Sequence, residues 1–174
     1  MRYFHYMDTE SQDQPIAVYM ALDDEAWPLQ ALFGASVAEE VALQWHNSSL
    51  NVNHPRHGLP ETCMQEFVPE MQEVSAEVFH SYWRLSLEKK WPQWLALQQN
   101  LALGQSLTAK IVCFYPQGVI ADVGLDFYAW LDYDECLAWV GKENMRPKHE
   151  MAACVSGFDN ENLWIKLKHE CART

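Results

Sequence analysis

Carboxylates and aromatic rings are interleaved between residues 122 and 135, a combination suited to holding cationic side chains of another protein. Carboxylates speed the approach of a basic protein and bind its lysines and arginines through charge-assisted hydrogen bonds. Aromatic rings are frequent anchors of protein interfaces. The alternative interpretation is an acidic face that is only solvated. The residues that we expect to bind a partner are Asp122, Asp126, Tyr128, Trp130, Asp132, Asp134 and Glu135.

A polar loop holds the residues whose types could bind a metal. His46, His54 and His57 surround it, and Glu61 could add a carboxylate. Their spacing matches no rigid pair of ligands on one helix or one hairpin. Histidines at the surface are the simpler interpretation. We therefore predict no metal site and no cofactor.

The motifs of nucleophilic and metal-assisted catalysis are missing from the sequence. No GxSxG, HExxH or phosphate-binding glycine loop is present. Cys136 follows Asp134 and Glu135, whose charges would raise the pKa of its thiol and disfavour a reactive thiolate. We predict that the protein is not an enzyme.

Composition favours a folded, acidic binding protein. Of the 174 residues, 49% are hydrophobic and eight are tryptophans, enough for a sizeable core. The formal charge is −12, which argues against general affinity for phosphate backbones. Residues 1–83 hold two cations against thirteen acids, so that this half alone carries −11. Such a charge steers a protein toward basic partners.

Five widely spaced cysteines indicate a reducing compartment. An odd count without a CxxC pair argues against a disulfide framework and against a zinc knuckle. Cys113 and Cys154 lie in apolar strand patterns and are expected to be buried thiols. No basic-then-apolar leader opens the chain, and no apolar run approaches ~18 residues. We expect a cytoplasmic protein that does not enter membranes.

Hydrophobic patterning predicts antiparallel strands and two helices in the first half. Strands are expected over residues 2–8, 16–23 and 28–33, the first two as a hairpin. Residues 34–46 fit either a helix or a further strand, and 47–62 read as a loop. Ser75 can cap a helix that extends to Lys90. Pro92 can open a shorter helix through residue 103 that links the two halves.

From Gly104 to His169 the sequence breaks into short strands with glycines between them. The stretch Gly118-Val-Ile-Ala-Asp-Val-Gly124 precedes a short helical link near Tyr133 to Trp139, and Val155 through Lys168 fits a closing hairpin. These features resemble the OB-fold repeat of an RNA-binding ribosomal small-subunit protein. The resemblance implies a five-stranded barrel. We therefore predict an α+β protein with an acidic domain over residues 1–100, built of antiparallel strands and one or two helices, and an OB-like barrel over 104–169.

The same resemblance implies that RNA binding has been weakened here. The stacking phenylalanine of the family falls on Ile120 and its histidine on Asp132. Loss of a stacking ring removes ~1–3 kcal/mol per base, and an aspartate repels phosphate. Phe127 and Trp130 remain as possible stackers, although core packing is the simpler role for them.

The first half resembles a small acidic domain found beside bacterial toxin genes. The resemblance covers roughly residues 2–87 and rests on Tyr3 to Asp8, on Gln14 to Trp27 and on Val74 to Trp83. It implies an immunity protein of a polymorphic-toxin or contact-dependent growth inhibition system. We expect this bacterial protein to neutralise a basic toxin, most simply a nuclease. The alternative is an RNA- or ribosome-associated OB-fold module that uses Lys110, Arg146, Lys148, Lys166 and Lys168 for phosphate contacts.

Overall fold

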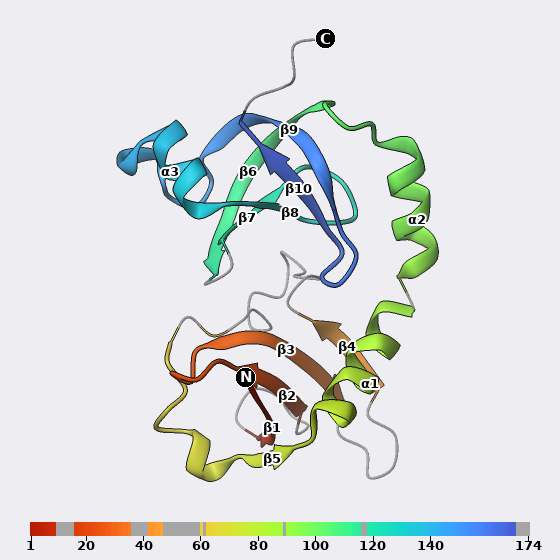
Figure 1. Ribbon diagram of the computed structural model, residues 1–174, viewed down its shortest axis with the longest axis vertical. Helices are drawn as coiled ribbons and strands as arrows, with labels where there is room; N and C mark the ends of the chain where they lie inside the picture. Colours follow the sequence, from red (N-terminus) through yellow and green to blue (C-terminus); the bar gives the residue numbers. More distant parts are fainter. Residues whose placement is uncertain are drawn as a thin grey trace. The chain divides into compact units, whose positions relative to one another are not determined.

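The chain folds into two compact units, Met1–Lys90 and Trp91–Thr174. The computed structural model describes residues 1–9, 16–35, 42–46, 60, 62–88, 90–115 and 118–169 (Figure 1). The sequence-based division instead assigned residues up to 100 to the first domain. The first unit contains fourteen acids and five cations, and the second contains ten and seven. The strong acidity therefore belongs to the first unit.

An open antiparallel sheet forms the centre of the first unit. Its strands are β1 (Arg2–Asp8), β2 (Ile16–Leu22), β3 (Pro28–Ala35), β4 (Ala42–His46) and β5 (Gln72–Val74), in the order β4-β3-β2-β1-β5. The hairpin predicted for residues 2–8 and 16–23 is confirmed, with Phe4 opposite Met20. For residues 34–46, the structure shows strand at 42–46, and residues 36–41 lie outside the described part.

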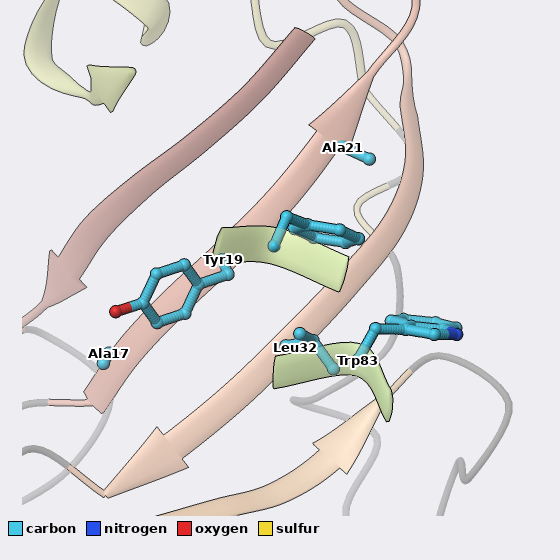
Figure 2. Close-up of a cluster of buried hydrophobic side chains, with 6 residues drawn as sticks. Ala17, Tyr19, Ala21, Leu32 and Trp83 are labelled. Carbon is cyan, nitrogen blue, oxygen red and sulfur yellow. The ribbon is translucent and has the colours of Figure 1, made fainter. Parts of the chain in front are cut away.

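Helix α1 (Ala76–Glu88), which lies within the helix predicted to extend from Ser75 to Lys90, packs on this sheet. The helix begins after Ser75, whose Oγ accepts a hydrogen bond from the Val78 amide at 3.3 Å. Phe79 and Trp83 lie one turn apart on α1 and are buried in one cluster with alternate residues of β2. Those residues are Ala17, Tyr19 and Ala21. Figure 2 shows Trp83 beside Leu32 of β3, another member of this cluster. Alternate residues of β2 and residues one turn apart on α1 thus pack together in one apolar cluster.

The second unit contains a five-stranded sheet that closes on itself. Its strands are β6 (Ser106–Tyr115), β7 (Gly118–Asp122), β8 (Ala129–Leu131), β9 (Glu150–Asp159) and β10 (Trp164–Lys168). The order is β10-β8-β7-β6-β9, and β9 pairs with β10 to complete the ring. Only β8 and β10 run parallel; every other neighbouring pair is antiparallel. The broad α+β prediction is confirmed.

Small and branched residues fill the ring. Ile111 is registered with Ala121, Ala121 with Ala129, and Ala129 with Ile165. All four are buried, and cross-strand partners share a face of the sheet. Their side chains therefore form one row across four strands. Helix α3 (Tyr133–Val140) and a short 3-10 turn, η4 (Lys142–Asn144), connect β8 to β9.

Helix α2 (Trp91–Asn100) belongs to the second unit, where its side chains contact the β9–β10 hairpin. Trp94 is fully buried, and its Nε1 donates a hydrogen bond to Asn160 Oδ1 at 2.9 Å. Its ring meets Phe127 and Phe158 edge-on, with centroids 5.0 and 5.7 Å away. The helix predicted as a link between the halves is therefore anchored to the closed sheet.

The cysteines correct two sequence-based predictions. Cys154 is disulfide-bonded, so it is not the buried thiol that its strand pattern indicated. Cys63, Cys113 and Cys136 form no disulfide, and Cys113, which was also expected to be buried, is half-buried. A disulfide is uncommon in reducing compartments, which removes one argument for the cytoplasm. Among the described residues, no helix is long and apolar enough to cross a membrane.

Candidate functional site

Two of the acids expected to bind a partner instead accept hydrogen bonds from nearby backbone amides. Asp122 ends β7, and its Oδ1 accepts a hydrogen bond from the Gly124 amide at 2.8 Å. Asp132 caps α3, with Oδ1 accepting from the Glu135 amide at 3.0 Å. The Asp132 carboxylate thus satisfies one of the amides at the start of α3 that have no partner within the helix. The charges of both acids remain near the surface, but their side chains are already committed to the fold.

The other three acids of the predicted set face solvent. Asp126 lies between β7 and β8, whereas Asp134 and Glu135 occupy the first turn of α3. All three are exposed, and no cation in the described part of the chain lies within ion-pair distance of them. The first turn of a helix favours negative charge, which gives Asp134 and Glu135 a structural role as well.

The two predicted aromatic anchors are mainly packing residues. Tyr128 is buried, and its backbone oxygen accepts from the Ile165 amide at 3.0 Å. Trp130 is half-buried over Gly118. A Cβ on Gly118 would meet the Trp130 indole nitrogen and the main-chain oxygen of Leu131. Trp130 thus fills the space that the glycine leaves open.

A neighbouring ring, Tyr133, which the sequence also interleaves with these acids, is more accessible. Tyr133 opens α3 and is 44% exposed, in edge contact with Phe114 at 6.2 Å between centroids. The signal for it was present in the sequence. Asp132 and Glu135 are three residues apart, the spacing of a helix cap, which would have placed Tyr133 at the exposed start of a helix. Tyr133, Asp134 and Glu135 are therefore brought together on one helical turn.

The residues at two positions that would stack on RNA bases are buried in the interior of the second unit. Ile120 is fully buried within β7. Phe127, a possible stacker, is 5% exposed and packs edge-on against Trp94. Because base stacking needs a free ring face, Phe127 is not available to a base in this conformation.

The groups that might support catalysis or metal binding lead to no site in the described residues. Cys136 is buried with its Sγ 3.9 Å from the Met151 sulfur, and burial raises the pKa of its thiol. The sequence attributed that effect to neighbouring acids; desolvation is the cause. No described group of histidine, cysteine or acidic side chains could hold a metal ion. His54, His57 and Glu61 lie outside the described residues, as does the side chain of His46.

Polar aromatic groups of the first unit gather under α1, where they stabilise packing. Tyr19 lies 4.6 Å from His5 and 4.8 Å from Tyr82 between ring centroids. Burial, together with the charge and the hydrogen bond of Tyr82, raises the pKa of Tyr19 to about 12. Burial also lowers the pKa of His5. Both shifts favour the neutral form, as expected for residues at the edge of a core.

Comparison with known proteins adds no relative. No protein-family model matches the chain, and no curated protein shows a significant match.

Proposed function

We propose that this protein is an acidic binding protein that neutralises a basic partner, as a cytoplasmic immunity protein does with a nuclease toxin. Nucleases grip phosphates with cationic surfaces, so an inhibitor can bind them by presenting carboxylates. The net charge of −12 and the fourteen acids of the first unit support a cationic partner. The proposal requires no cofactor and no catalytic group.

The second unit supports this proposal as a barrel of the OB type. Its first three strands form a meander, a helix follows the third, and the third and fifth strands run parallel. This connectivity is the basis for proposing an OB-like barrel. In our proposal the barrel has been retained as a scaffold while its role in RNA binding has been lost.

One observation favours a protein partner over RNA. Phe127, which a nucleic-acid-binding role would need as a stacking ring, is packed against the buried Trp94. Nearby, Asp132 uses its carboxylate to cap α3. Of the residues predicted to bind a partner, the exposed ones are the acids Asp126, Asp134 and Glu135. Such a surface repels phosphates and attracts lysines and arginines.

The proposal is tested by capturing the partner. The tagged full-length protein is co-expressed with the products of its neighbouring genes and purified with and without RNase. We expect a stoichiometric basic protein that survives RNase, and relief of growth arrest when that protein is expressed as a toxin. Recovery of RNA or ribosomal proteins only, lost on RNase treatment, would overturn the proposal.

RNA binding is the second candidate, favoured by one cluster of cations. The Lys148 amide donates to the Ile111 oxygen at 2.8 Å, which brings Lys148 beside Lys110 on β6. Both side chains are exposed, as is that of Arg146. A single-stranded RNA titration at low and high salt tests this role, because phosphate contacts weaken steeply with salt. Absence of binding at low salt would exclude it.

A further inference from the structure

A second acidic and aromatic surface lies on the first unit, outside the set of residues that the sequence predicted to bind a partner. It combines the turn between β2 and β3 with the segment that follows residue 61 and includes the 3-10 turn η3 (Val68–Glu70). We call it the turn surface. Its members are Glu25, Trp27, Glu66, Phe67 and Glu70.

Backbone contacts hold the two halves of the turn surface together. The Met64 amide donates to the Ala26 oxygen at 2.8 Å, and Cys63 Sγ donates to the Glu25 oxygen at 3.1 Å. The Phe67 amide then donates to the Met64 oxygen at 2.9 Å. Figure 1 shows the segment leading to η3 running beside the β2–β3 turn. Trp27 and Phe67 therefore come from adjacent pieces of backbone.

The turn itself has a fixed conformation. Asp23 Oδ1 accepts from the amides of Glu25 and Trp27 at 2.9 and 2.8 Å. Ala26 has a φ of +63°, which a residue with a Cβ rarely adopts. A fixed backbone presents Trp27 with little loss of conformational entropy when a partner binds.

Two large rings on this surface are left in water. Trp27 is 38% exposed and Phe67 is 48% exposed. Glu25, Glu66 and Glu70 are exposed beside them, and no cation of the described residues lies within ion-pair distance of these three carboxylates. Exposed rings bordered by unpaired acids are complementary to an apolar patch bordered by lysines or arginines.

We infer that the turn surface is where the basic partner docks, an inference that rests on the proposed function. The occupant is a folded basic protein that places cationic side chains against Glu25, Glu66 and Glu70 and apolar side chains against the two rings. The competing surface is the exposed part of the barrel set, Asp126, Asp134 and Glu135. Its unit is far less acidic, and its two predicted anchors are packed into the fold.

Two charge-matched variants of the full chain separate the surfaces. One carries Glu25→Gln, Glu66→Gln and Glu70→Gln, and the other carries Asp126→Asn, Asp134→Asn and Glu135→Gln, so each loses three negative charges. The probe is a short synthetic peptide that alternates Lys with Leu. Affinity is measured by titration, and the contact region by backbone hydrogen exchange. Circular dichroism checks that both variants are folded.

The turn-surface variant should bind the peptide on the order of tenfold more weakly, and the barrel variant should change affinity by less than about threefold. Exchange should slow in residues 23–27 and 62–70 of the wild type. Stronger loss in the barrel variant, equal losses in both, or no peptide binding would each overturn the inference, because net charge or another face would then explain the attraction.

A second pair of variants tests the rings. Trp27→Ala with Phe67→Ala should weaken binding on the order of thirtyfold or more. Val78→Ala with Leu85→Ala, which truncates exposed apolar residues on α1, should leave affinity unchanged. Equal effects of the two pairs would overturn the role of the rings.

The captured partner distinguishes the inference from the function. A basic protein that binds the wild type and the turn-surface variant equally well would support the function and overturn the docking surface. If no basic protein is captured but the peptide protects the turn surface, the surface stands and the proposed function falls.

Discussion

The two five-stranded sheets of this protein differ in their edges, because the first sheet is open and the second is closed. The first unit leaves β4 and β5 as edges, and β5 is only three residues long. At the β5 edge, Arg2 of β1 forms a diagonal ion pair with Glu73, which is registered with Phe4, at 3.0 Å between Nη2 and Oε2. The second unit pairs β9 with β10 and leaves no edge within the ring. An open sheet depends on a covering helix, whereas a closed sheet depends on the fit of its own interior.

The largest effect is expected where the helix covers the open sheet. Phe79→Ala removes a fully buried ring between α1 and β2, and should lower the free energy of unfolding by about 3–5 kcal/mol. Urea denaturation measures the loss, and hydrogen exchange should accelerate first in β2. Val78→Ala, on the exposed side of α1, should cost less than about 1 kcal/mol. Similar losses at the two positions would mean that α1 does not stabilise the sheet through this face.

In the closed sheet, the corresponding sensitive position is a glycine. Gly118→Ala places a Cβ against the Trp130 ring and the Leu131 backbone at a φ of +142°, and should cost about 2–4 kcal/mol. Gly124 also has a positive φ, of +70°, but its Cβ would enter open space. Gly124→Ala should therefore cost only about 1–2 kcal/mol. Thermal unfolding of the two variants separates crowding from backbone strain, and equal losses would show that crowding at Gly118 is negligible.

A smaller effect is expected where α2 attaches to the closed sheet. Asn160→Ala removes the oxygen that accepts from Trp94 Nε1, and should cost about 1–3 kcal/mol because the indole donor is buried. Gln98→Ala removes the second donor to the same oxygen at 2.8 Å, from a more exposed residue. It should cost less than about 1 kcal/mol. Urea denaturation compares the two variants. If Gln98→Ala lowered the free energy of unfolding more than Asn160→Ala, the Trp94 hydrogen bond would not be what anchors α2.

The smallest effect appears only in alkali. Tyr19 has a folded pKa of about 12, above its ordinary value of 10, so the neutral form is favoured in the folded state. Its contribution to stability is complete below pH 10 and is lost as the pH rises toward 12. In Tyr19→Phe, the midpoint of urea unfolding should fall less between pH 9 and pH 11 than in the wild type. Parallel pH profiles would indicate that Tyr19 ionises normally in the folded protein.

The sequence predicted the elements of both sheets better than their contacts. Alternation identified β1 and β2, and the Ser75 cap identified the start of α1. These signals are local, because a strand or helix shows its buried face in its own period. The alanine and glutamate content left 34–46 undecided, and pairing of β4 with β3 settled residues 42–46.

Contacts between distant residues carried no local signal. Trp94 and Asn160 are 66 residues apart, so the role of α2 depends on how the second unit closes. For the candidate site, residue type predicted which side chains are charged, but not which side chains are exposed and able to contact a partner. Tyr128 is buried and Tyr133 exposed because β8 ends at Leu131 and the chain turns into α3. The disulfide at Cys154 was equally unpredictable, since pairing of cysteines is decided by distance in the fold.

The parallel pairing of β8 with β10 also has a consequence for the order of folding. Only Ala129 and Trp130 are registered with β10, at Ile165 and Lys166, whereas β6 has longer ladders with β7 and β9. The short β8–β10 pairing joins segments that are more than thirty residues apart in the sequence. Closing this long loop costs conformational entropy, and only a few hydrogen bonds offset that cost. We expect this pairing to form last and to open first. Its opening would expose two strands at once, through which neighbouring molecules could exchange β10 at high concentration.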